Sequence, residues 1–251
     1  MRCAVLSDVH SNLEALTAVL AALAAERIDR YLCLGDVVGY GADPAACLSR
    51  LQACEAVMVG GNHDLACIGR FDDRWFNPFA RAAVRWTRDR LGFADLDLLR
   101  RLPLTQTLEP CTLVHGTLRH PEQFEYLVET GQAIDTLTVC QTLLCLVGHT
   151  HVPYFLEYDR RAQRIGRLLT AAADLADVRF EADPDGRRYL LNPGSVGQPR
   201  DGDPRASFAV LDTDARRVSI RRVPYDVAAA QRKIREGGLP AFLADRLALG
   251  R

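Results

Sequence analysis

The chain is poor in lysine: Lys233 is the only lysine among its 31 lysine and arginine residues. Chemistry through a P-loop or Schiff-base lysine in the first half of the chain is therefore excluded. The formal net charge of −1 provides no broad basic surface for a nucleic-acid backbone. Because no apolar run approaches the roughly 20 residues that span a bilayer, we also expect no membrane association.

The sequence lacks a C-x-x-C pair, although it contains eight cysteines. Most of them lie within apolar runs, which favours buried free thiols over disulfides or a zinc knuckle. Asp8 places a carboxylate where a secretory signal would need its apolar stretch. We therefore expect a cytoplasmic protein.

What is present is the composition of a globular α/β protein. The 251 residues are 48% hydrophobic and 25% charged, which fits one domain spanning 1–251. Short apolar runs alternate with helical patterns in the first half, as in βαβ units. We expect strands at 3–7, 31–34 and 56–59, a helix from about 12 and a second helix over 44–53.

The second half changes from helical patterns to closely spaced strands. Residues 77–101 read as helical, and we expect the segment of about 70–102 to form a helical flap. Further strands are predicted at 112–114, 143–147, 154–158, 164–169, 187–191, 206–211 and 217–223, with a turn at 183–186. Two helices from about 227 and 240 close the chain, and their apolar stripe of Leu239, Phe242, Leu243 and Leu247 is expected to cover the sheet.

Five predicted strands each end in a cluster of residues that can bind a metal. The clusters are Asp8-Val-His10, Gly35-Asp36, Gly61-Asn-His-Asp64, His115-Gly116 and Gly148-His-Thr-His151. Taken singly, each is compatible with an ordinary cap, turn or solvated histidine. Ligands bind beyond the carboxyl ends of strands in open α/β sheets, so the five loops can converge on one place. Together the clusters predict a metal site.

The chemistry of this ligand set indicates which ions it would hold. Imidazole and carboxylate together suit Mn, Fe, Co, Ni or Zn better than calcium. Two carboxylates, four histidines and one amide are too many for a single tetrahedral ion and enough for two ions that share a bridging carboxylate. Two divalent cations against two aspartates leave a surplus of positive charge, which favours an anionic substrate such as a phosphate ester.

In this order, the five motifs resemble the calcineurin-like metallophosphoesterase superfamily, whose pattern is D-x-H, G-D, G-N-H-[DE], H and G-H-x-H. The later segment Leu190-Leu-Asn-Pro-Gly-Ser-Val-Gly197 resembles one found near the end of compact bacterial members. The resemblance implies an α/β fold of four αββα layers with two mixed β-sheets. It also implies a dinuclear metal centre at the strand ends.

The resemblance further implies a role for each matching residue. Asp8, His10 and His151 would hold one metal ion, Asn62, His115 and His149 the other, and Asp36 would bridge the two. His63 would be the catalytic residue that contacts the scissile phosphate and protonates the leaving oxygen. Asp64, the second residue assigned to catalysis, would orient the His63 ring.

One departure from the family bears on the substrate. Protein Ser/Thr phosphatases of the superfamily carry G-D-x-V-D-R-G at the second motif, whereas this chain has Tyr40 in place of the arginine. The change favours compact phosphodiesterases. Phosphate still requires a donor, so we assign Arg119, Arg200 and Asn192 to substrate binding; Arg205 lies in a comparable loop.

Aromatic residues are concentrated between Phe71 and Trp86, directly after the His63 loop. They either form a wall that stacks a nucleobase or pack the helical flap onto the sheet, and the second interpretation is favoured. The sequence as a whole predicts a metal-dependent phosphodiesterase that acts on a small nucleotide-like diester, and leaves a homo-oligomer open. The alternatives are a phosphomonoesterase or protein phosphatase, and a non-catalytic metal-bound interaction module.

Overall fold

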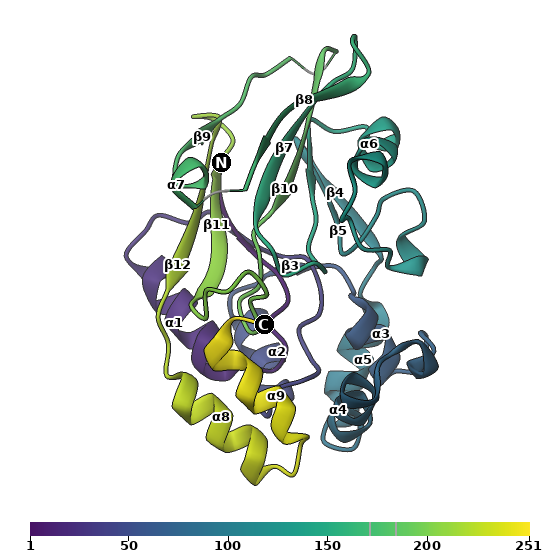
Figure 1. Cartoon of the computed structure of the whole chain (residues 1–251), viewed down its shortest axis with the longest axis vertical. Helices are drawn as coiled ribbons and strands as arrows, with labels where there is room; N and C mark the ends of the chain where they lie inside the picture. The colour runs from purple at the N-terminus through teal and green to yellow at the C-terminus, as the bar shows by residue number, and fades with distance from the viewer. Residues whose placement is uncertain (171, 184) are drawn as a thin grey trace.

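The structure is a computed structural model that describes residues 1–170, 172–183 and 185–251. Two six-stranded mixed sheets pack face to face, and the helices lie outside them (Figure 1). One sheet has the order β3-β2-β1-β11-β12-β9 and the other the order β4-β5-β6-β10-β7-β8. No helix among the described residues is long and apolar enough to cross a membrane. The cytoplasmic location stays a prediction.

The first sheet is built around the predicted βαβαβ unit, which is confirmed. Its parallel strands are β1 (Arg2–Leu6), β2 (Arg30–Cys33) and β3 (Val57–Met58), joined by α1 (Leu13–Ala24) and α2 (Pro44–Ala53). The antiparallel strands β11 (Ala206–Asp212), β12 (Arg217–Val223) and β9 (Val178–Arg179) complete it, with α7 (Ala172–Leu175) before β9. The caps match the sequence signals: Asn12 accepts a hydrogen bond from the Ala15 N–H, and Pro44 opens α2.

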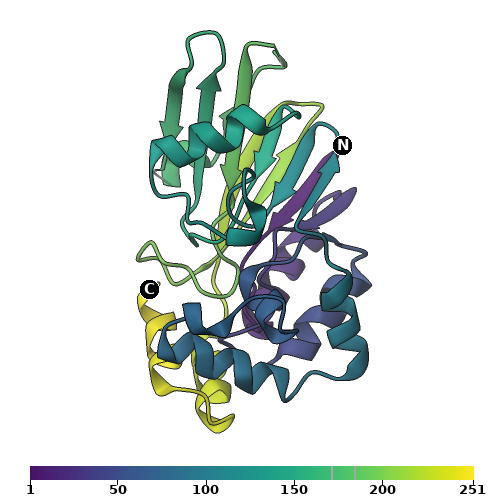
Figure 2. The same ribbon diagram turned by 90° about the vertical axis from the view of Figure 1, so that its right-hand side faces the viewer.

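The second sheet contains elements that sequence patterns did not predict. Its parallel strands are β5 (Cys111–Val114), β6 (Leu144–Leu146) and β10 (Arg187–Asn192), and its antiparallel strands are β4 (Thr105–Leu108), β7 (Tyr154–Asp159) and β8 (Arg164–Leu169). Its unpredicted elements are β4 and α6 (Thr130–Val139), and α6 lies on the outer face of this sheet (Figure 2). In the first sheet, β9 and the preceding α7 were not predicted either. Of the predicted 183–186 turn, residue 184 lies outside the described residues.

Successive side chains of the central strands point alternately into the layer between the sheets and towards the outer helices. Val5 of β1 and Leu191 of β10 point into the layer between the sheets. Their neighbours point the other way: Leu6 packs under α1 and α2, and Leu190 packs under α6. A period of two that is apolar on both faces is expected when both faces of a sheet are covered. The predicted four-layer αββα sandwich is confirmed.

The predicted helical flap is divided into several short helices. α3 (Asn62–Cys67) and the 3₁₀ turn η1 (Asp73–Trp75) precede α4 (Pro78–Arg88) and α5 (Phe93–Arg101), and a second 3₁₀ turn, η2 (Pro121–Gln123), follows β5. The helical stretch predicted over 77–101 is present, and it consists of the two helices α4 and α5. Gly92 interrupts it, since its N–H donates to Asp95 Oδ2 at 3.0 Å and starts a new helix.

The C-terminal helices α8 (Val227–Glu236) and α9 (Ala241–Asp245), followed by η3 (Arg246–Leu249), do not cover a sheet. Their apolar stripe packs instead against Ala80 and Ala83 of α4 and against Tyr40. The expectation that they cover the sheet is therefore wrong, because α1 and α2 already occupy that face. The expectation of free thiols is confirmed: all eight cysteines are free, and every one except the half-buried Cys54 is buried.

Candidate metal centre

The predicted ligands lie in loops at the carboxyl ends of strands from both sheets. Asp8, Asp36 and Asn62 follow strands of the first sheet, whereas His115 and His149 follow strands of the second. The loops are fastened to each other through the backbone: Asp8 N–H donates to Gly35 O at 3.0 Å, and Gly148 N–H donates to His115 O at 2.9 Å. Ligand residues from distant parts of the sequence are thus held at one point, as the topology predicted.

Several residues of the site adopt a left-handed backbone conformation. Asp8, His10, Asp36, His149 and His151 have φ values of 53°, 48°, 52°, 66° and 60°. This region is unfavourable for residues other than glycine, although Asp and His tolerate it better than most. Backbone strain of this kind is concentrated at functional sites, where the surrounding structure enforces it.

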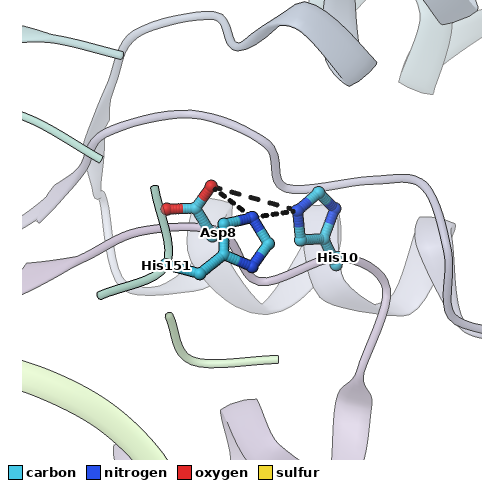
Figure 3. Close-up of side chains that lie close together, drawn as sticks. All are labelled: Asp8, His10 and His151. Carbon is cyan, nitrogen blue, oxygen red and sulfur yellow. Dashed lines mark hydrogen bonds and ion pairs between the residues drawn. The ribbon is translucent and has the colours of Figure 1, made fainter. Parts of the chain in front are cut away.

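Asp8, His10 and His151 form a fully buried cluster in which three ligand atoms point toward one another (Figure 3). Asp8 Oδ1 lies 3.2 Å from His151 Nε2 and 3.9 Å from His10 Nε2, and the two Nε2 atoms are 3.1 Å apart. The other carboxylate oxygen of Asp8 accepts hydrogen bonds from Ser7 Oγ at 2.6 Å and from the His149 N–H at 3.1 Å. Only Oδ1 is left for a ligand.

The tautomers of this cluster follow from the partners of the other ring nitrogens. His10 Nδ1 lies 3.1 Å from Val38 O, and His151 Nδ1 lies 2.5 Å from Gln198 O. A carbonyl only accepts, so both Nδ1 atoms carry the proton and both Nε2 atoms present lone pairs. Two lone pairs 3.1 Å apart beside a carboxylate oxygen repel each other. A divalent cation between them would remove that repulsion, so these residues fit a metal ion.

Asp36, His115 and His149 form a second buried cluster next to the first. His115 Nε2 lies 3.1 Å from His149 Nδ1 and 3.3 Å from Asp36 Oδ2, and its Nδ1 lies 2.7 Å from Leu34 O. Asp36 Oδ2 is also 3.6 Å from His10 Nε2 of the first cluster, while Oδ1 accepts the His63 N–H at 2.9 Å. One oxygen of Asp36 therefore lies between the two clusters, where a bridging carboxylate would be needed.

Unpartnered buried atoms support the same assignment. Among the described residues, twelve buried side-chain atoms have no hydrogen-bond partner, and three of them are Asp8 Oδ1, Asn62 Oδ1 and His149 Nε2. Such atoms are rare in folded proteins, because a buried polar group without a partner is unfavourable by about 1–3 kcal/mol. All three belong to the predicted ligand set. The structure brings all seven predicted metal ligands together, and metal binding by them stays a prediction.

His63 is buried at the edge of the clusters, within van der Waals reach of aromatic rings. Its ring centroid is 4.9 Å from His10, 4.4 Å from Tyr40 and 4.6 Å from Phe76. Its Nδ1 is buried without a hydrogen-bond partner. Gly39, which has a φ of 90°, permits this approach: a Cβ at that position would lie 2.5 Å from His63 Nδ1. The ring also lines the pocket described below.

The expectation that Asp64 orients the His63 ring is wrong. Both oxygens of Asp64 accept backbone hydrogen bonds, Oδ1 from Val38 N–H at 3.1 Å and Oδ2 from Gly61 N–H at 3.0 Å. Burial and the nearby charge of Asp36 raise the pKa of the Asp64 carboxyl to about 7. Asp64 therefore fastens the start of α3 to the Asp36 loop and acts on the position of the site, not on the ring.

Charges within the clusters shift the histidine pKa values in opposite directions. Burial lowers the pKa of His63 to about 4 and that of His149 to about 3. Burial would also lower the pKa of His115, but the charges of Asp36 and Asp8 raise it to about 9. Burial opposes ionisation of Asp8 and Asp36, yet the adjacent histidines keep both pKa values below the ordinary range. Ionised carboxylates beside mostly neutral imidazoles are the states that bind divalent metals.

A pocket of about 590 Å³ opens directly onto the clusters. It is lined by Asp36, Asn62, His149 and His151 together with His63, Arg200, Tyr40 and several aromatic side chains. Its volume lies in the range of pockets that bind small molecules. Of the residues assigned to substrate binding, Arg200 lines this pocket, whereas Arg119 is exposed and does not. Arg205 is paired with Asp203 on the surface.

Asn192 is buried and its amide is fully engaged within the protein. Its Nδ2 donates to Gly148 O at 2.8 Å and to Thr150 Oγ1 at 3.0 Å, and its Oδ1 accepts the Gly194 N–H at 2.9 Å. Asn192 does not line the pocket. The structure thus gives it a different place from the one assigned from the sequence: it holds the loop that carries His149 and His151.

The aromatic residues between Phe71 and Trp86 serve both purposes, because some line the pocket and others pack the helices. Phe71, Trp75 and Phe76 line the pocket, whereas Phe79 stacks on Phe242 and the Trp86 Nε1–H donates to Gly237 O. The lining also contains Phe124 and Tyr126, which sequence reasoning missed. They lie in an irregular loop after β5, where neither spacing nor a motif distinguishes them.

Comparisons with known proteins agree with this geometry. The family model described as Calcineurin-like phosphoesterase superfamily domain matches residues 1–216. An uncharacterised protein of Methanocaldococcus jannaschii, MJ0912, is 37% identical over 252 aligned residues, covering 99% of this chain and 98% of the relative. The solved structure of a metallophosphoesterase from Sphaerobacter thermophilus is similar with a TM-score of 0.85 and 42% identity, covering 100% and 99% of the two chains. A hypothetical protein from Pyrococcus horikoshii, PH1004, has the same fold at 21% identity, with a TM-score of 0.78 and coverage of 100% and 98%.

Proposed function

The chain belongs to the calcineurin-like phosphoesterase superfamily, and we propose that it is a metal-dependent phosphodiesterase that hydrolyses a small nucleotide-like diester. The observation that carries the proposal is the arrangement of the His10 and His151 rings. Their unprotonated Nε2 atoms face each other at a distance of 3.1 Å. They lie beside unpartnered carboxylate and amide oxygens, at the bottom of a pocket that also contains a guanidinium. This combination suits an anionic phosphoester above two cations.

Each polar residue of the site has a proposed role. Asp8, His10 and His151 would hold one cation, Asn62, His115 and His149 the other, and Asp36 would bridge them. Bound divalent cations, with manganese as the proposed metal, would supply an activated water and neutralise charge on phosphate. Arg200 would donate hydrogen bonds to the phosphoryl oxygens.

His63 is proposed to protonate the leaving oxygen. Its pKa of about 4 in the structure is lower than a proton donor at neutral pH requires. An anionic phosphoryl group beside the ring would raise that pKa, because an opposite charge stabilises the imidazolium. The His63 ring lines the pocket, where such a group would bind.

The pocket favours a diester over a monoester. A diester carries a single negative charge, whereas a monoester carries about two near neutral pH. Arg200 is the only guanidinium or ammonium group among the residues that line the pocket, and Tyr40 stands at the motif position where related phosphatases have an arginine. The aromatic lining of Phe71, Phe76 and Phe124 suits a nucleobase on one arm of the ester.

The experiment compares bis-p-nitrophenyl phosphate with p-nitrophenyl phosphate after loading with Mn²⁺ or Ni²⁺. We expect faster hydrolysis of the diester, its loss in EDTA, and its loss in Asp36→Asn and His149→Ala. His63→Ala should retain its metal and lose roughly 10²- to 10⁴-fold in rate. His120→Ala is the matched control, because His120 is exposed and pairs only with Glu122. Diester turnover that survives Asp36→Asn would rule the proposal out.

Two other functions give different outcomes in the same assay. A phosphomonoesterase, including a protein phosphatase, would hydrolyse p-nitrophenyl phosphate faster than the diester. A non-catalytic interaction module would bind metal tightly and hydrolyse neither substrate. The buried His63 at the pocket wall favours an enzyme over this last alternative.

A further inference from the structure

A second hollow of about 320 Å³ lies beside the metal pocket. Half of its lining residues are aliphatic, and we call it the aliphatic groove. These residues are Leu127, Val128, Ala133, Val152, Leu156 and Leu168. Two of these side chains are open to water, since Val128 is 74% exposed and Leu168 is 48% exposed. Aliphatic surface that remains open to water in a concave place is typical of a binding site.

The groove and the metal pocket share one wall. Tyr126 lines both hollows, and its ring stacks on His149 with 3.8 Å between centroids and 25° between planes. Along the loop after β6, His149 and His151 line the pocket while Thr150, between them, lines the groove. The two hollows are therefore adjacent, and the Tyr126 ring lies between the metal clusters and the groove.

The two hollows differ in the chemistry of their walls. The metal pocket is lined by Arg200, by the acidic residues Glu122 and Glu125, and by aromatic rings of which Phe71, Phe76 and Phe124 meet edge to face. The polar groups of the groove are the hydroxyls of threonines and tyrosines, and Glu129 is the one charged residue in its lining. An anionic occupant would be repelled by Glu129, and a nucleobase would find no amide or guanidinium with which to pair. A chain of methylene groups gains from this lining, because it buries apolar surface on both sides.

The wall between the hollows is rigidly held. Asn192 donates to Thr150 Oγ1 at 3.0 Å and to Gly148 O at 2.8 Å, which fixes the loop from below. On the other side, Tyr126 lines the metal pocket together with Arg200. The phosphate-binding side of the wall and the groove side are thus parts of one structure.

We propose that the aliphatic groove binds an uncharged alkyl chain on the non-leaving arm of a phosphodiester, a substrate class that rests on the proposed phosphodiesterase function. The leaving arm would lie in the aromatic part of the pocket near His63. The natural substrate would then carry one aromatic or nucleoside arm and one aliphatic arm.

The test uses p-nitrophenyl esters of methyl, butyl and hexyl phosphate with the Mn²⁺-loaded protein. All three release the same p-nitrophenolate, so differences in kcat/KM report the second arm. Full burial of one methylene is worth about 0.8 kcal/mol, which is about fourfold. For an open groove we expect about twofold per methylene, or roughly tenfold from methyl to butyl. Leu168→Asp should abolish this gain, so that kcat/KM no longer rises from the methyl to the hexyl ester.

The control is Leu249→Asp, because Leu249 is 56% exposed and lines neither hollow. It should keep the full dependence on chain length. Val128→Asp is a second groove variant in a loop, and thermal unfolding at the wild-type temperature verifies that each variant is folded. A wild-type rate independent of chain length would overturn the groove assignment, as would a chain dependence that survives both groove substitutions. Absence of any diester hydrolysis would instead refute the proposed function.

Discussion

Replacing Asn192 by alanine tests how the fold positions the ligand loop between β6 and β7. The change removes three hydrogen bonds of a fully buried amide, to Gly148 O, Thr150 Oγ1 and Gly194 N. Each is worth about 1 kcal/mol net, so we expect the metal-free protein to lose roughly 3 kcal/mol of unfolding free energy. Because the same loop carries two predicted ligands, we also expect Mn²⁺ to bind roughly 10- to 100-fold more weakly.

The assay has two parts. Urea unfolding in EDTA measures the stability of the metal-free protein, and calorimetric titration with Mn²⁺ measures affinity. Asp226→Ala is the matched control, since this N-cap of α8 accepts only the Ala229 N–H at 2.8 Å and lies outside the metal pocket. It should cost about 1 kcal/mol of stability and leave the Mn²⁺ affinity unchanged.

The two measurements separate positioning from general destabilisation. If Asn192→Ala lowers stability as much as expected while Mn²⁺ binds as in the wild type, the loop does not depend on this amide. The role assigned to Asn192 would then be refuted. A wild-type stability would show instead that the three hydrogen bonds are replaced by others.

Three further predictions concern the clusters and the pocket. A Cβ on Gly61 would overlap the Asp36 carboxylate and lie 2.5 Å from the backbone nitrogen of Asp36. Gly61→Ala should therefore abolish metal binding in a Mn²⁺ titration. Gly131→Ala is the control and should bind Mn²⁺ as the wild type does, because a Cβ there meets open space. The pKa of His115 is raised to about 9 in the folded protein from an unfolded value near 6.5. The protonated His115 ring therefore contributes its full stabilisation of the folded state below pH 6.5, and this contribution is lost as pH rises through 9. Urea unfolding in EDTA should show a loss of roughly 3 kcal/mol over that window, and none with saturating Mn²⁺. Arg200→Met should retain metal and lower kcat/KM for the diester by roughly 10- to 100-fold, with Arg200→Lys in between.

The parts of the fold that could be predicted are those with a local physical cause. The strands of the βαβαβ unit are apolar runs, and α1, α2 and α4 begin at residues whose side chains or rings fix a helix start. The convergence of the ligand loops followed from one rule, that parallel strands end at the same edge. Helix α6 carries no comparable signal, because its cap Glu129 and weak apolar face resemble a solvated loop.

The error at Asp64 has a geometric origin. In the sequence it adjoins His63, and adjacency suggested a contact between the two side chains. The chain is helical from Asn62 onward, and consecutive residues on a helix point about 100° apart. His63 therefore faces the pocket while Asp64 faces the backbone of the neighbouring loop. Whether a ligand motif continues as a strand or as a helix decides which side chains meet, and the residues alone did not decide it.

Tyr40 and Arg200 show what only the tertiary structure supplies. The motif around Tyr40 lacks the arginine of related phosphatases, yet the guanidinium of Arg200 lies 5.9 Å from the centre of the Tyr40 ring. It is brought there by the loop after β10, where Gly197 N–H donates to Asp8 O at 3.0 Å and Arg200 N–H donates to His151 O at 3.3 Å. Because these bonds tie the loop to two predicted metal ligands, the group that would bind phosphate and the residues that would bind the cations are positioned together. If Arg200 binds phosphate as proposed, the absence of an arginine at one motif position moves the phosphate contact to another loop and does not remove it.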